Sequence, residues 1–185
     1  MSDAAGTSLV IRPAQVDDAA LILQLICELA DYERLGHEVT ATIEQVRASL
    51  FGVTPHAEAL LAEVGGATAG YALYFHNYST FHARRGLYLE DLFVRPGFRR
   101  RGIGKQLLAH LAATAVARGC ARFEWAVLDW NTPSIDFYRT LGAVPQQDWT
   151  VFRLDGAALQ HLADESPQPA SAQSAARDPQ SHRVT

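Results

Sequence analysis

Residues 87–108 read Leu87-Tyr-Leu-Glu-Asp-Leu-Phe-Val-Arg-Pro-Gly-Phe-Arg-Arg-Arg-Gly-Ile-Gly-Lys-Gln-Leu-Leu108. The first half has the apolar pattern of a strand and ends at Arg95-Pro-Gly97, whereas from Gly104 onward the leucines have helical spacing. Gly102 and Gly104 allow the backbone to turn tightly. The N–H groups of the first turn of the helix have no partner within that helix and point outward. The cationic side chains of this turn are Arg99, Arg100, Arg101 and Lys105. We therefore interpret the segment as a strand, an anion-binding turn and the start of a helix.

Two well-known phosphate motifs do not match this turn. A dinucleotide fingerprint requires a third glycine at the position of Leu107, and a nucleotide P-loop requires Ser or Thr where Gln106 stands. The pattern present is Arg99-x-x-Gly102-x-Gly104 after an apolar strand. A basic glycine turn that only caps a helix has the same pattern, so the motif alone leaves both interpretations open.

The composition limits the class of protein and of partner. The chain has 185 residues, 48% of them hydrophobic and 19% charged, which suits one compact domain with a sizeable core. Its net charge of −4 gives no general attraction for nucleic acid or for a membrane surface, so an anion site has to be local. Two cysteines, Cys27 and Cys120, cannot form the disulfide framework of a small secreted protein, and no Cys/His set has metal-ligand spacing. With neither a signal-like start nor a membrane-length apolar run, we expect a cytoplasmic protein without a metal.

The chain divides by composition near residue 164. Residues 164–185 contain no aromatic side chain and a single branched aliphatic one, Val184, which predicts a disordered tail after a domain of residues 7–163. Within that domain, hydrophobic spacing and turn residues predict helices and strands in alternation. The predicted strands are 9–12, 59–64, 69–75, 86–94, 122–128 and 150–154; the predicted helices are 16–30, 42–50, 104–118 and 132–141. A polar loop is predicted over 76–85. This order indicates an α+β fold with α/β-type layers, in which a mixed, mostly antiparallel central sheet is flanked by helices.

Several segments in addition to the turn resemble one family. The Arg99-x-x-Gly102-x-Gly104 turn is similar to the pyrophosphate-binding loop of the GNAT N-acetyltransferase superfamily. Ile11-Arg-Pro-Ala14, Glu28-Leu-Ala-Asp-Tyr-Glu33, Leu87–Val94 and Val127-Leu-Asp-Trp-Asn-Thr-Pro-Ser-Ile-Asp-Phe-Tyr138 resemble its diamine (spermidine/spermine) and thialysine branch. The resemblance covers residues 9–163. It implies the GNAT acyl-CoA N-acyltransferase fold, acetyl-CoA as donor, direct transfer to a primary amine in a ternary complex, and a homodimer.

The resemblance also assigns residues to the donor and to the chemistry. Main-chain groups of three strand residues would hold the pantetheine arm and the acetyl oxygen, the turn would hold the pyrophosphate, and positions 131, 134 and 138 would complete the site. The predicted cofactor-binding residues are Leu92, Phe93, Val94, Arg99, Arg100, Arg101, Gly102, Ile103, Gly104, Lys105, Asn131, Ser134 and Tyr138. Tyr138 matches the acid that protonates the leaving thiolate, and Glu90 matches the carboxylate that takes a proton from the amine. Asn131 is also a plausible helix cap, Tyr138 could simply pack in the core, and Glu90-Asp91 could be an exposed pair without a role.

The acceptor is the least defined part of this prediction. Positions matching or next to the amine-binding residues of the branch are Tyr32, Glu33, Glu90, Asp91 and Glu124, and their acids suit a cationic amine. The polyamine enzymes have further acidic residues where this chain has Asn77–His82 and Gln146-Gln147, so we expect a lysine-like or thialysine-like amino acid or a short diamine at least as much as a long polyamine. The alternatives are a non-catalytic acetyl-CoA-binding sensor and a protein-lysine acetyltransferase.

Overall fold

The computed structural model describes residues 8–167, which fall into two compact units that meet in sequence between Thr132 and Pro133. The first unit holds the sheet and its helices, and the second holds α4, which begins at the boundary (Thr132–Thr140), and α5 (Gly156–Asp164). Of the predicted tail 164–185, residues 168–185 lie outside the described residues.

The first unit is built on a five-stranded sheet with the strand order β1-β2-β3-β4-β5. The strands are β1 (Leu9–Pro13), β2 (Glu58–Val64), β3 (Ala67–Ser79), β4 (Arg84–Val94) and β5 (Phe123–Trp125). Neighbours from β1 to β4 pair antiparallel, and β5 pairs parallel to β4 after a helical crossover. The predicted mixed, mostly antiparallel sheet flanked by helices is therefore confirmed.

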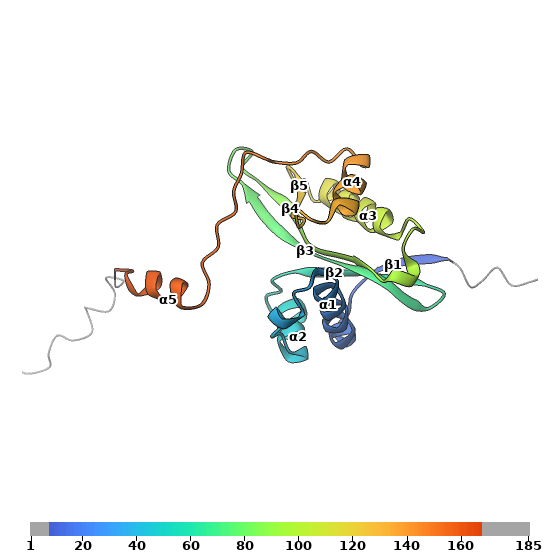
Figure 1. The fold of residues 1–185 in the computed structure, drawn as a ribbon, viewed down its shortest axis with the longest axis horizontal. Coiled ribbons are helices and arrows are strands. Elements are labelled where there is room, and N and C mark those ends of the chain that lie inside the picture. The colour runs from blue at the N-terminus through green and yellow to red at the C-terminus, as the bar shows by residue number, and fades with distance from the viewer. Residues whose placement is uncertain (1–7, 168–185) are drawn as a thin grey trace, which may run out of the picture. The chain divides into compact units, whose positions relative to one another are not determined.

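Helices cover both faces of this sheet (Figure 1): α1 (Ala19–Glu33) and α2 (Ile43–Phe51) lie on one face and α3 (Ile103–Ala117) on the other. Local sequence explains where two of them begin. The Thr42 hydroxyl accepts the N–H of Gln45 and the Gln45 side chain accepts the N–H of Thr42, a capping box that starts α2. Gly102, at φ 77°, is the N-cap of α3.

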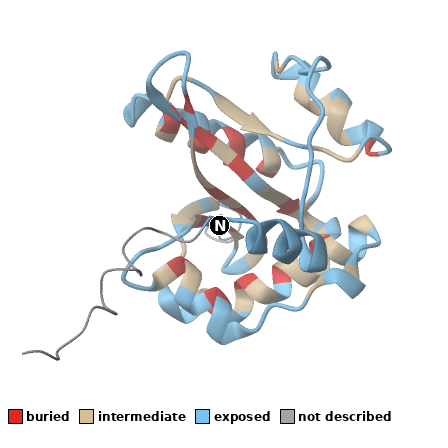
Figure 2. Cartoon of the chain, turned by 90° about the vertical axis from the view of Figure 1, so that its left-hand side faces the viewer, coloured by how far each residue is buried: buried red, intermediate tan, exposed pale blue. Residues whose placement is uncertain are grey.

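The core lies between the sheet and helices α1, α2 and α3, and Figure 2 shows the buried positions along the strands and on these helices. Leu25 of α1 and Leu61 and Tyr71 of the sheet are completely buried in one cluster with Phe93. Complete burial of a leucine side chain contributes roughly 1.5–3 kcal/mol. This packing fixes β4 and the end of α1 relative to each other.

A β-bulge interrupts the pairing of β3 with β4. Leu73 lies opposite Asp91 but Tyr74 lies opposite Leu89, so Glu90 is the extra residue of the bulge. In a regular strand Leu89 and Asp91 would face the same side. Because of the bulge, Leu89 shares a face with Tyr74, whereas Asp91 turns to the α1 face and reaches Tyr71.

The structure corrects three predicted elements and adds a helix. Residues 76–79 and 84–85 of the predicted loop extend the β3–β4 hairpin, because backbone pairing tolerates polar side chains near its tip. Strand β5 is shorter than the predicted 122–128, and α5 was not predicted. The predicted strand 150–154 is wrong: within residues 8–167 no segment pairs with it, and unpaired backbone does not form a strand. None of the helices in residues 8–167 has the length and apolar character needed to cross a membrane.

Candidate active site

The edge of β4 opens beyond Leu89. Parallel pairing with β5 covers only Leu87–Leu89 against Phe123–Trp125. From Asp91 to Val94 the strand pairs with β3 on one side, and no strand in residues 8–167 pairs with the other side of β4 beyond Leu89. The main chain of Leu92, Phe93 and Val94 therefore runs along the open part of this strand.

The basic turn follows directly after this open edge. Arg100 (φ 62°) and Gly102 (φ 77°) both have left-handed backbone conformations. The N–H groups of residues 103–105 have no acceptor within α3, since they belong to its first turn. A Cβ at Gly102 would have no heavy atom within 4 Å, so the backbone angle, not crowding, favours glycine there. The predicted residues Arg99–Lys105 thus form an anion-binding turn at a helix N-terminus.

Arg99 differs from the other cations of the turn. Its Nε donates to the carbonyl oxygen of Val94 at 2.8 Å, and its guanidinium carbon lies 4.7 Å from the centre of the Tyr32 ring. Arg99 therefore joins the end of β4 to the end of α1. Arg100, Arg101 and Lys105 are exposed, as a turn that receives a dissolved anion requires.

Two predicted residues meet in an aromatic cluster beside Arg99. The Tyr32 hydroxyl lies 3.5 Å from Oδ1 of Asn131, and the Tyr32 and Trp130 rings are 6.0 Å apart between centres. Asn131 is buried, with 7% of its surface exposed. A predicted acceptor residue and a predicted donor residue therefore share one wall. Trp130 was not predicted as a site residue, although it lies within a segment that carries the family resemblance.

Next to Tyr32 in the chain, Glu33 belongs to a partly buried acidic cluster with Asp91. The Tyr71 hydroxyl donates to Oδ2 of Asp91 at 2.7 Å. Burial raises the pKa of Asp91, and the Tyr71 hydrogen bond opposes this rise only in part. Burial and the Asp91 charge likewise raise the pKa of Glu33. Two carboxyl groups with raised pKa values in one place favour the arrival of a cation, which would compensate their charge. Sequence reasoning did not select Tyr71, since one tyrosine on an apolar strand gives no signal of its partner.

Glu90 and Glu124 have different surroundings. Glu90 is exposed on the bulge. The pKa of Tyr88 is raised mainly by the burial of its own hydroxyl, then by the negative charge of Glu90 and, less, by that of Glu124. Glu124 is an ion-pair partner of Arg122 at 2.6 Å and accepts a hydrogen bond from Asn77 at 2.9 Å. Its charge is therefore already compensated within the sheet.

The second unit carries the remaining predicted residues. Ser134 and Tyr138 lie four positions apart on α4, so they share one side of that helix. The Tyr138 ring packs 5.5 Å from the Phe137 ring between centres, and its carbonyl oxygen accepts the N–H of Leu141 at 3.0 Å. The catalytic and donor-binding roles of these two residues stay predictions.

Comparison with known proteins identifies the family of this site. The model of the acetyltransferase (GNAT) family matches residues 23–143, which include the open strand, the basic turn, all of α3 and most of α1. The chain belongs to the GNAT family. Thialysine N-epsilon-acetyltransferase from Sus scrofa is 40% identical over 167 residues, covering 84% of this chain and 98% of the relative. An L-ornithine N5-acetyltransferase from Arabidopsis thaliana is 32% identical over 197 residues, covering 82% of this chain and 86% of the relative.

Solved structures agree with this assignment. An integron cassette protein from V. cholerae superposes with a TM-score of 0.73 at 25% identity, over 85% of this chain and 99% of that one. The predicted GNAT fold is confirmed, and so is the prediction of an N-acetyltransferase that acts on an amine.

Proposed function

We propose that this GNAT enzyme transfers the acetyl group of acetyl-CoA directly to a primary amine of a small cationic acceptor, without an acetylated enzyme. The observation that carries the proposal is the open strand Glu90–Val94 leading into the turn Arg99–Lys105. Main-chain groups along the strand suit a pantetheine arm, and the N–H groups and cations of the turn suit a pyrophosphate. When bound, acetyl-CoA supplies the thioester that is cleaved.

The chain's own residues supply the proton transfers. Glu90, exposed on the bulge at the start of the open edge, accepts a proton from the arriving ammonium so that a neutral amine can attack. Tyr138 donates its phenolic proton to the thiolate that leaves, and its phenolate takes up the second proton that the amine nitrogen loses as the amide forms. Asn131 and Ser134 complete the donor site in this proposal. A direct transfer is supported by the sequence around Cys27 and Cys120, since neither cysteine has a histidine next to it that could activate a thiol nucleophile.

The acidic cluster selects the acceptor class. Asp91 and Glu33 are the carboxyl groups whose buried charge a second ammonium on the acceptor would compensate, while Tyr32 forms an aromatic wall. Relatives named for thialysine and L-ornithine act, by those names, on amines of amino acids. We therefore place lysine-like, thialysine-like and ornithine-like amino acids first, and diamines and polyamines after them. Glu124, already paired with Arg122, would act only after rearrangement.

We further propose a homodimer in the cytoplasm. Large apolar side chains are exposed within the second unit, where Trp149 is 74%, Val151 87% and Phe152 92% exposed. A second chain that covers this segment would remove these surfaces from water.

Turnover tests the proposal. Thiol release from acetyl-CoA is measured over ornithine, lysine, thialysine, diamines, polyamines and lysine peptides. We expect turnover with at least one free amino acid, a large loss of kcat for Glu90→Gln, and no change for Glu44→Gln, a matched loss of one charge on the distant helix α2. Acetyl-CoA binding without thiol release from any amine would instead support the sensor alternative, and turnover confined to peptides would support a protein-lysine acetyltransferase. Acetylated enzyme formed from acetyl-CoA alone would contradict direct transfer.

A further inference from the structure

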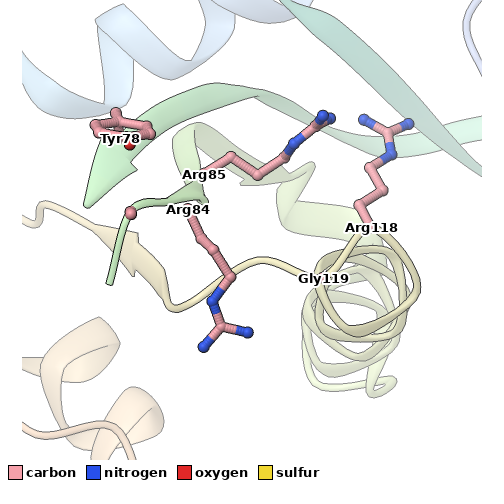
Figure 3. A pocket seen from close by; sticks show the side chains of 6 residues that line it. Tyr78, Arg84, Arg85, Arg118 and Gly119 are labelled. Atoms are coloured by element: carbon pink, nitrogen blue, oxygen red, sulfur yellow. The ribbon is translucent and has the colours of Figure 1, made fainter. Parts of the chain in front are cut away.

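A hollow lies at the other end of α3 from the basic turn. It has a volume of about 470 Å³, within the range of small-molecule sites. Since α3 has 15 residues and rises about 1.5 Å per residue, the hollow lies roughly 22 Å along the helix from the turn at its start. Its lining comes from the tip of the β3–β4 hairpin and the end of α3 (Figure 3): Tyr78, Ala83, Arg84, Arg85, Arg118 and Gly119.

Positive charge in this hollow is only partly compensated. Arg118 forms a bidentate ion pair with Glu58, in which Nη2 of Arg118 lies 2.8 Å from Oε2 of Glu58. No carboxylate in residues 8–167 lies within ion-pair distance of Arg84 or Arg85. By contrast, Arg122, just beyond α3, is paired with Glu124. The hollow therefore carries about two uncompensated charges in a chain whose net charge is −4.

The end of α3 does not account for these cations. A helix C-terminus stabilises a nearby cation by only about 0.3–1 kcal/mol at an exposed site, and Arg118 already lies at this end of α3 as its C-cap residue. Arg84 and Arg85 are consecutive on β4, so their side chains leave the strand on opposite sides, as Figure 3 shows. Both line the hollow, so one ligand that reached both would have to be longer than a single phosphate.

His76 gives an independent indication. Its Nε2 is buried and has no hydrogen-bond partner within residues 8–167. Burial, then the charges of Arg118 and Arg85, hold the pKa of His76 below its usual value, and Glu58 opposes them. A buried polar atom without a partner is unusual in a folded protein. An anion in the hollow would offset the charges of Arg118 and Arg85, which lower the pKa of His76.

We infer that the hollow between the β3–β4 hairpin and the end of α3 binds a small organic polyanion of the polyphosphate class, held by Arg84 and Arg85. The exposed Tyr78 ring, 61% accessible, offers an apolar surface beside these charges. This site is separate from the proposed acetyl-CoA site and does not rest on that function.

Binding of tripolyphosphate to the full chain, followed by NMR of the His76 imidazole, tests the inference. His76→Gln assigns the signal. We expect tripolyphosphate to shift it and to raise the pKa of His76, with inorganic phosphate binding more weakly. In Arg84→Gln/Arg85→Gln the dissociation constant taken from the His76 signal should rise at least about tenfold, since each hydrogen bond to a charged group is worth a factor of this order.

The matched control removes two cations from the turn instead. In Arg100→Gln/Arg101→Gln the His76 response should stay within twofold of the wild-type chain. An unmoved His76 signal in the wild-type chain overturns the inference. An equal affinity in Arg84→Gln/Arg85→Gln also overturns it. Both side chains are exposed and form no ion pair within residues 8–167, so we expect their replacement to leave the fold intact, as circular dichroism would verify.

Discussion

Replacing Tyr71 by phenylalanine isolates the hydrogen bond that holds Asp91. The hydroxyl donates to Oδ2 of Asp91 at 2.7 Å, and Tyr71 is completely buried, so water cannot easily replace the lost donor. Hydrogen bonds to charged groups contribute about 1.5–3 kcal/mol, and we expect a loss of this size in the free energy of unfolding at pH 7.

The loss should depend on pH in a defined direction. Burial raises the pKa of Asp91 above its ordinary value, which means that the folded state favours the protonated carboxyl group. The contribution of Asp91 to the free energy of unfolding therefore falls as the pH rises through this raised pKa. Tyr71→Phe removes the one interaction that favours the ionised form and raises this pKa further. The difference between variant and wild type should therefore shrink as the pH is lowered from 7 through the raised pKa of Asp91, because the carboxyl group then gains a proton.

Tyr74→Phe is the matched control. Tyr74 is a buried tyrosine on the same strand, and its hydroxyl donates to Glu58 at 3.1 Å. The pKa of Glu58 is lowered, mainly by its Arg118 partner, so this carboxylate stays ionised as the pH falls from 7 to 5. Urea unfolding of both variants at each pH is the assay. Equal pH dependence of the two differences would refute the reasoning, as would a Tyr71→Phe loss that does not change with pH.

Three further outcomes follow from particular contacts. Gly70→Ala would place a Cβ 2.3 Å from the carbonyl oxygen of Phe93, and we expect a loss of about 1–3 kcal/mol or about 2–10 °C in Tm, seen by thermal unfolding; an unchanged Tm would contradict the backbone approach. Glu28→Gln removes a carboxylate that Arg95 holds with two hydrogen bonds of 2.7 and 2.8 Å, and since both side chains are partly exposed we expect a loss of about 1 kcal/mol at pH 7. That loss should disappear in acid, because the ion pair stabilises the fold only at pH values above the lowered pKa of Glu28. A loss that persists below this pKa would refute the pairing. Tyr138→Phe should lower kcat with little change in acetyl-CoA affinity measured by calorimetry, whereas an unchanged kcat would exclude Tyr138 as the acid.

Local sequence determined much of this protein. Alternating apolar residues, Gly65-Gly66 and the Thr42 cap predict most strands, the first hairpin and helix α2, because these depend on neighbours within a few residues. The basic turn could also be predicted from the sequence, because a glycine with a left-handed backbone and the start of a helix both depend on neighbouring residues.

Only the tertiary structure decided which groups meet. The sequence Leu87–Val94 does not predict that Glu90 is the extra residue of a bulge, because a bulge depends on the pairing with β3. It also does not predict that the Asp91 side chain reaches the Tyr71 hydroxyl as a result. Other contacts likewise depend on residues that only the fold brings together. They are the pairing of Glu124 with Arg122 and Asn77 and the contact of Arg99 with Tyr32. The absence of a strand partner for residues 151–154 within residues 8–167 also depends on the fold. Periodicity reports the faces of an element, whereas the identity of the opposing atoms comes from residues far away in the chain, so the burial and charge state of each acid could be known only after folding.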